Sequence, residues 1–131
     1  MPKVKTFLTF SGTAVEAMTF YTSLLPDSAI LDVEYYGPNE EGAEGTVRVA
    51  TFTLNGQEYM AIDTSIEHAW TFTPAISLHV TCESPAEVDR LYVALSQDGE
   101  VFMPLDTYPF SPRYTWFSDK FGVSWQIMFV E

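Results

Sequence analysis

The first half of the chain alternates between short β-type runs and one segment of helical periodicity. Residues 4–10 are rich in β-branched and aromatic side chains and stop at Ser11-Gly12, which predicts a short strand ending in a turn. Thr13 and Glu16 have the spacing of a capping box, in which the hydroxyl and the carboxylate each accept a backbone N–H at a helix start. Apolar residues then recur every three or four positions until Pro26, so we expect a helix here.

Three further runs of strand character follow this helix. They cover Ala29–Tyr36, Thr46–Leu54 and Gln57–Asp63, and the last two are joined by Asn55-Gly56. Asn-Gly favours a two-residue hairpin because both residues tolerate the positive φ angles of a type I′ turn. The predicted order of the first half is therefore βαβββ.

The same order is predicted again in the second half. Residues 75–81 alternate apolar with small or polar side chains, as a half-buried strand does. Ser84-Pro85-Ala86-Glu87 forms a second capping box with Pro at the first helical position, and Gln97-Asp98-Gly99 ends the predicted helix. The three remaining predicted strands are Glu100–Met103 or slightly longer, Arg113–Ser118 and Ser124–Val130.

This repetition predicts the fold class. The two capping boxes lie 71 positions apart (84 − 13), and each stands between a strand and a helix. We expect an α+β fold of two βαβββ modules whose sheets curl around a concave cavity, with a helix packed outside each sheet. The prediction is one domain, residues 1–131, made of modules covering about 1–65 and 74–131.

Composition and charge narrow the choice of partners and location. Six Lys and Arg residues against 18 Asp and Glu give a formal net charge of −12, without a cationic stripe to bind phosphates. We therefore expect neither nucleic acid nor membrane as a partner. Cys82 is the one cysteine and cannot form an internal disulfide, and the N-terminus lacks the apolar stretch of a secretion signal, so the predicted location is cytoplasmic.

Four segments carry a resemblance to a known family. The chain resembles the vicinal oxygen chelate superfamily, the βαβββ-duplicated fold of glyoxalase I, bleomycin-resistance proteins and extradiol dioxygenases, and within it the PhnB-like group. Domains of this group often carry the label 3-demethylubiquinone-9 3-methyltransferase, although no strand–Gly-x-Gly-x-Gly–helix element is present to hold S-adenosylmethionine. The segments are residues 20–28, Leu54-Asn55-Gly56-Gln57, residues 80–83 and, most specific, residues 116–126 with Asp119-Lys120-Phe121-Gly122-Val123-Ser124-Trp125-Gln126.

The resemblance implies a divalent metal held by His and Glu side chains from the strands around the cavity. Aligned on the shared segments, the four ligand places fall on Thr6, a residue near Ala61, Ala75 and Gln126. Since none of these is a His, Cys or carboxylate, we predict no metal and no cofactor. Asp63 and His79 stand two or four residues along from lost ligand places, and a displaced site made from this pair remains an alternative.

Alternation along the second half places several polar side chains toward the predicted cavity. Ala75, Ser77, His79 and Thr81 share one face, and the apolar set Ile76, Leu78, Val80 and Cys82 covers the helix. His79 would then bind a ligand or act as a base, or it is simply satisfied by Ser77 or a neighbouring strand. Gln126 points away from Trp125 and Ile127, and its amide would orient a polar ligand or bond to backbone or water. Tyr114, Trp116 and Trp125 form either an aromatic wall for a planar ligand or part of the core.

These observations favour a small-molecule binding protein that works without metal. The predicted ligand-binding residues are Thr6, Asp63, Ser77, His79, Trp116 and Gln126. One alternative is a lyase, isomerase or dioxygenase-type enzyme with His79 as the candidate catalytic residue, and another is a structural or interaction protein whose cavity is filled. The resemblance also implies a homodimer. The chain lacks the nucleophile elbow, the phosphate-binding loop and the His-Glu-x-x-His motif, so their chemistries have no support.

Overall fold

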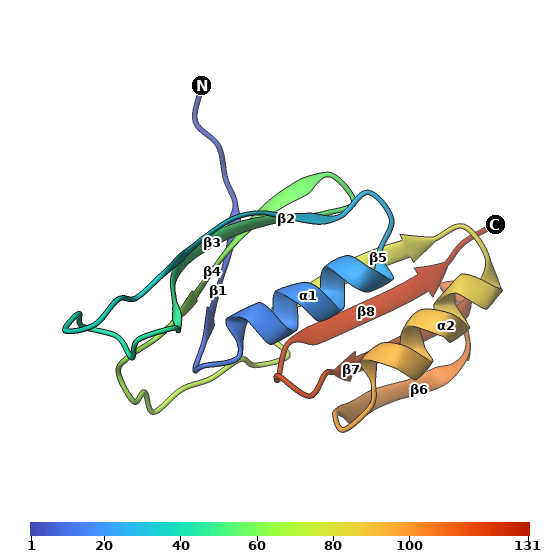
Figure 1. The fold of residues 1–131 in the computed structure, drawn as a ribbon. Coiled ribbons are helices and arrows are strands. Elements are labelled where there is room, and N and C mark those ends of the chain that lie inside the picture. Colours follow the sequence, from blue (N-terminus) through green and yellow to red (C-terminus); the bar gives the residue numbers. More distant parts are fainter. The chain divides into compact units, whose positions relative to one another are not determined.

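The computed structural model describes all residues, Met1–Glu131, and divides into two compact units, Met1–His68 and Ala69–Glu131. Figure 1 labels the elements of both units. Each unit holds a four-stranded sheet and one helix in the order βαβββ, which confirms the predicted α+β fold of two modules.

The first unit contains β1 (Thr6–Phe10), α1 (Ala14–Leu24), β2 (Ala29–Tyr35), β3 (Val47–Leu54) and β4 (Gln57–Asp63). Its strands lie in the order β1-β4-β3-β2, with β1 parallel to β4 and the other pairs antiparallel. The turn between β3 and β4 has φ of 52° at Asn55 and 79° at Gly56, as a type I′ turn requires.

The second unit contains β5 (Ser77–Cys82), α2 (Pro85–Leu95), β6 (Glu100–Tyr108), β7 (Ser111–Ser118) and β8 (Ser124–Phe129). Its sheet has the equivalent order β5-β8-β7-β6, again with one parallel pair, β5 and β8. The strand predicted to start at Ala75 starts at Ser77, and Ile76, assigned to the helix-facing set, lies before the strand and is 77% exposed.

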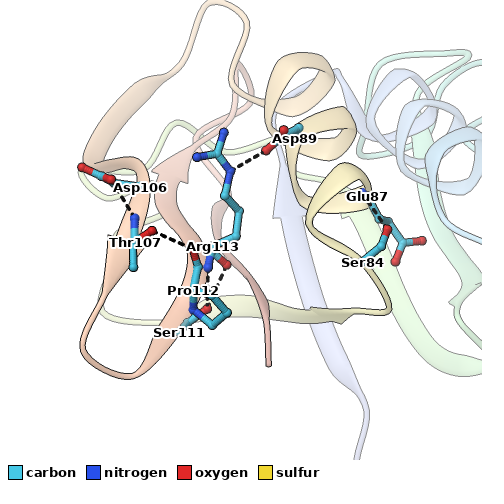
Figure 2. Close-up of polar contacts among 8 residues, drawn as sticks. All are labelled: Ser84, Glu87, Asp89, Asp106, Thr107, Ser111, Pro112 and Arg113. Atoms are coloured by element: carbon cyan, nitrogen blue, oxygen red, sulfur yellow. Dashed lines mark hydrogen bonds and ion pairs between the residues drawn. The ribbon is translucent and has the colours of Figure 1, made fainter. Parts of the chain in front are cut away.

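The two helices begin differently. The Ser84 hydroxyl accepts the Glu87 N–H at the start of α2 (Figure 2), as the second capping box predicts. The Glu87 carboxylate in turn accepts the Glu83 N–H. The predicted capping box of α1 is wrong, because the Thr13 side chain makes no capping hydrogen bond. A residue far along the chain, Asp63, caps α1 instead, as described below.

Each helix buries its apolar stripe against one face of its own sheet. The stripe of α2 consists of Val88, Leu91 and Leu95. The stripe of α1 includes Met18 and Tyr21, whereas Val15 is 38% exposed and lies outside it. The remaining buried residues of α1 are Ala14 and Ala17.

Candidate functional site

Side-chain contacts identify the face of the second sheet that packs on α2. The Arg113 guanidinium on β7 donates to the Asp89 carboxylate of α2 at 2.8 Å (Figure 2), and the Phe117 ring meets Tyr92 of α2 edge to face at 5.8 Å. Strand pairing places Trp125 opposite Phe117 and Leu78 opposite Trp125, so these residues share the helix side. The alternate residues of β5, β7 and β8 lie on the other side.

We call that other side the polar face of the second sheet. It brings together four of the six predicted ligand-binding residues: Ser77 and His79 from β5, Gln126 from β8 and Trp116 from β7. Gln126 on β8 pairs with His79 on the neighbouring strand β5 and with Trp116 on the other neighbouring strand, β7. The remaining members of the polar face are Thr81, Tyr114, Ser118, Ser124 and Met128.

A continuous chain of hydrogen bonds crosses the polar face. The Tyr114 hydroxyl donates to Gln126 Oε1 at 2.7 Å, and Gln126 Nε2 donates to Ser77 Oγ at 3.4 Å. Ser77 Oγ lies 2.7 Å from Ser124 Oγ, which in turn accepts the Trp116 indole N–H at 2.9 Å. The chain fixes an amide and a hydroxyl in place across three strands, which is the kind of preorganised polar group found in ligand sites.

His79 is exposed and stands beside this chain. Its Nε2 lies 3.1 Å from the thioether sulfur of Met128. Because a thioether can only accept, Nε2 carries the hydrogen in this contact, and in the neutral ring the lone pair is then on Nδ1. His79 therefore has a hydrogen-bond acceptor and base that no other group of the structure occupies.

The aromatic side chains have separate roles. Trp125 is 1% exposed on the helix side, so it belongs to the core and not to an aromatic wall on the polar face. Tyr114 is 4% exposed within a cluster with Tyr108 and Phe110, with its ring centroid 5.5 and 4.8 Å from theirs. Burial raises the pKa of the Tyr114 phenol, and Tyr108 adds to the rise, so the hydroxyl stays a donor. Only Trp116, half-buried and edge to face with Phe102, offers an indole to the polar face.

Two predicted ligand-binding residues lie on the helix side of the first sheet. The assignment of Thr6 to the cavity face is wrong, because Thr6 shares its face with the buried Leu8 and Phe10. Ala61, the neighbour of an expected ligand place, pairs with Leu8 on this same side and is fully buried.

Asp63 also lies on the helix side, where it has a structural role. Its Oδ1 accepts the N–H groups of Gly12 and Ala14 at 2.9 and 3.0 Å, and its Oδ2 accepts the Val47 N–H at 3.0 Å. The carboxylate is 4% exposed and joins the end of β4 to the start of α1 and of β3. Asp63 shares its face of β4 with Ala61, and that face packs on α1.

Asp119 is a second buried carboxylate, and no sequence motif marks it as a ligand or catalytic residue. It accepts the N–H groups of Phe121 and Val123 and the Trp125 indole N–H, all within 3.0 Å. Together with Gly122, whose φ is 92°, it shapes the turn that leads into β8 and hence places Gln126. The signal in the sequence is the Asp-x-x-Gly spacing that precedes Ser124-Trp125-Gln126.

The equivalent positions of the first sheet carry different chemistry. Phe7 and His79 each lie three residues before the end of the first strand of their unit, and Met60 pairs with Phe7 as Gln126 pairs with His79. Two residues before Phe7 and Met60, Lys5 and Glu58 form an ion pair at 2.9 Å. The equivalent residues of the second unit are Ser77 and Ser124. The hydrogen-bonded polar chain is thus a property of the second unit.

The polar face does not fit the divalent metal implied by the resemblance. Among the polar-face residues of β5, β7 and β8, His79 is the one His, Cys or carboxylate residue. The groups around it that could ligate a metal are a thioether, an amide and hydroxyls. No group of three or more His, Cys, Asp or Glu side chains in the structure is placed to hold a metal ion. We therefore derive no chemistry through a metal.

Surface hollows lie elsewhere on the two units. One is lined by Lys3–Lys5 and Gly56–Glu58, and another by Tyr108–Pro112 with Val130 and Glu131. A third surrounds Ser11, Gly12 and Asp63, whose carboxylate is already bound by backbone N–H groups.

Comparisons with known proteins place this fold in a class. A glyoxylase/bleomycin resistance protein/dioxygenase domain from Frankia sp. has a TM-score of 0.65 with 20% identity, covering 100% of this chain and 93% of that chain. The fold is thus the one found in glyoxalase/bleomycin resistance proteins. The chain matches none of the curated proteins compared with it.

The family follows from closer matches. The model of the 3-demethylubiquinone-9 3-methyltransferase family matches residues 2–128, and the chain belongs to this PhnB-like family. The PhnB protein of Bacillus cereus is 53% identical over 98% of this chain and 100% of that chain, with a TM-score of 0.96. A protein of Pseudomonas aeruginosa is 25% identical over 98% of both chains, with a TM-score of 0.84.

Proposed function

We propose that the chain binds a small planar organic molecule on the polar face of the second sheet, without a metal. The observation that supports this proposal is the hydrogen-bonded chain that fixes the Gln126 amide and the Ser77 hydroxyl near the half-buried Trp116 indole. An indole face attracts planar rings, and fixed polar groups orient them. The donors of the face do not suit a metal, so binding rests on these side chains alone.

The proposal can be tested by NMR with isotope-labelled protein in the presence of a chelator. We expect members of a panel of small planar aromatic compounds to shift the Trp116 indole N–H and the Gln126 side-chain N–H signals saturably. Replacing the amide in a Gln126→Leu variant is expected to weaken binding about tenfold or more. A Met60→Leu variant, at the equivalent position of the first sheet, is the matched control and should bind normally. Unchanged affinity in Gln126→Leu, or no saturable shift at either group, would overturn the proposal.

The proposal that binding requires no metal can be tested separately. A specific ligand of the folded state raises the unfolding temperature in proportion to RT ln(1 + [L]/Kd). We expect no saturable rise when chelator-treated protein is scanned with Ni, Zn, Mn, Fe(II) or Mg. A rise with one of these metals that a His79→Ala variant abolishes would restore a metal site.

A second candidate function is an enzyme in which His79 is the base. The contact between Nε2 and the Met128 sulfur, which leaves the Nδ1 lone pair available, is the observation that favours it. In that case His79→Ala should abolish turnover of a bound compound while the fold and the binding affinity are kept. Turnover that survives this substitution would exclude His79 as the base.

We also propose that the protein is a cytoplasmic homodimer. The dimer is supported by the resemblance and by large apolar side chains that the first unit leaves about half exposed, among them Phe7, Leu31 and Tyr35. No helix of the structure combines the length and the apolar character needed to cross a membrane. Light scattering should give twice the chain mass of 14.8 kDa, and a monomer mass would contradict the dimer.

A further inference from the structure

The hydrogens of the polar chain can be assigned from what each group is able to donate. The Trp116 indole is a donor only, so Ser124 Oγ must accept from it. Ser124 is 2% exposed, and the one remaining side-chain partner for its own hydrogen is Ser77 Oγ at 2.7 Å. The reverse direction would leave a buried hydroxyl hydrogen without an acceptor, which costs about 1–3 kcal/mol in general. The hydrogen bonds therefore run from Trp116 through Ser124 to Ser77.

The other end of the chain is fixed in the same way. The buried Tyr114 hydroxyl has one side-chain partner, the Gln126 amide, so its hydrogen goes to Gln126 Oε1. With the amide turned over, Nε2 would donate to the phenol oxygen, and the buried phenol hydrogen would be left without a side-chain acceptor. Gln126 Nε2 therefore faces Ser77 and donates to it.

This assignment leaves two donors unused. Ser77 Oγ accepts from both Ser124 and Gln126, so both of its lone pairs are engaged and its own hydrogen has no acceptor. Gln126 Nε2 carries a second hydrogen that is likewise without a partner. Both residues are half-buried, and their donor atoms lie 3.4 Å apart, so the polar face presents two neighbouring donors.

We propose that the ligand presents an uncharged carbonyl oxygen to Ser77 and Gln126. This inference rests on the function proposed above and names its substrate class. A carbonyl oxygen has two lone pairs and can accept both hydrogens at once. The polar face has no Lys or Arg on β5, β7 or β8, and the chain carries a net charge of −12, so an anion would find no neutralising partner.

A pair of isosteric probes tests this inference directly. Acetophenone and α-methylstyrene have the same planar shape and differ only by C=O against C=CH2. We expect acetophenone to bind the full chain at least about tenfold more tightly, followed at pH 8 by the Trp116 and Gln126 N–H signals. Benzoate, its anionic counterpart, should bind more weakly than the ketone.

Substitutions locate the preference on the proposed donors. In a Ser77→Ala variant the ketone should lose its advantage and bind like α-methylstyrene. Thr81→Val is the matched control, because Thr81 lies on the same strand and face, and it should keep the full preference.

The possible outcomes separate this inference from the proposed function. Equal binding of the two isosteres by the unmodified chain overturns the carbonyl inference and leaves ligand binding on the face in place. Tighter binding of benzoate overturns the uncharged class. If neither isostere shifts the Trp116 and Gln126 signals, both proposals fail. The comparison of probes on the unmodified chain holds even if Ser77→Ala does not fold.

Discussion

Asp63 shows how one buried carboxylate can determine a local structure. It accepts three backbone N–H groups, two of which, those of Ala14 and Val47, are buried. We expect Asp63→Ala to lower the free energy of unfolding by about 3 kcal/mol or more, because these donors lose a charged acceptor. Asp63→Asn should cost less, since one oxygen remains to accept two of the three hydrogens. Urea unfolding measures both changes.

The control for this prediction is Asp32→Asn. Asp32 is an exposed carboxylate on β2 of the same sheet, so its substitution should change the free energy of unfolding by no more than about 0.5 kcal/mol. If Asp63→Ala were as mild as this control, the capping role assigned to Asp63 would be wrong.

Cys82 gives a pH dependence with a defined sign. Burial raises the pKa of its thiol from 9.0 to about 12, and the neighbouring Glu87 carboxylate adds to the rise. Because the folded pKa lies above the unfolded one, the folded protein keeps a proton that the unfolded chain releases. The contribution of the Cys82 thiol to the free energy of unfolding should therefore fall by about 1 kcal/mol between pH 8 and pH 9.5.

The measurement compares urea unfolding of the unmodified chain and a Cys82→Ala variant at the two pH values. Other titrating groups, such as the terminal amine, occur in both proteins and cancel in the difference. A stability difference that stays constant between pH 8 and pH 9.5 would show that the thiol pKa is not raised.

At the scale of the element, the two helices test local against long-range capping. The Ser84 hydroxyl caps α2, whereas the Thr13 hydroxyl at the same place before α1 makes no capping bond. We expect Ser84→Ala to destabilise the protein by about 1 kcal/mol and Thr13→Ala by less than about 0.5 kcal/mol. Thermal and urea unfolding of the two variants check this. Equal losses would mean that Thr13 caps α1 in solution after all.

This contrast explains which elements could be predicted from the sequence. The cap of α2 lies within four residues, and the Asn55-Gly56 turn is encoded by two, so both patterns are visible locally. The cap of α1 joins residues 49 and 51 positions apart, which no local spacing shows. Strand β6 extends beyond Met103 to Tyr108. Its pairing with β7 has three register shifts, and these disrupt the alternation from which its full length could have been predicted.

The candidate site was predictable where only one face of a strand is apolar. On β5 the alternation of Leu78, Val80 and Cys82 with polar residues identifies the helix side, and the faces of Ser77 and His79 follow correctly. On β1 both faces are apolar, with Phe7 on one side and Leu8 on the other. The alternation therefore shows which residues share a face, but it does not show which face packs on the helix. For this reason the alternation alone does not show that Thr6 lies on the helix side.

At the scale of the whole molecule, the surplus of negative charge acts on stability. Lys5, Arg48 and Arg113 form four ion pairs, and all four are partly exposed to solvent. Exposed pairs contribute little, whereas a net charge of −12 disfavours the compact state through self-repulsion. Screening should therefore weaken repulsion more than it weakens the ion pairs.

We predict that the unfolding temperature rises when NaCl is increased from 0.01 to 0.15 M. This change shortens the screening length from about 30 to about 8 Å, so repulsion between distant carboxylates is lost while contacts within an ion pair at about 3 Å persist. The expected rise is a few degrees, equivalent to about 1 kcal/mol for a chain of this size. Choline chloride at the same ionic strength should have the same effect, because screening does not depend on which monovalent cation supplies it. An unfolding temperature that falls with salt would mean that attraction between opposite charges outweighs the repulsion among the 18 acidic residues.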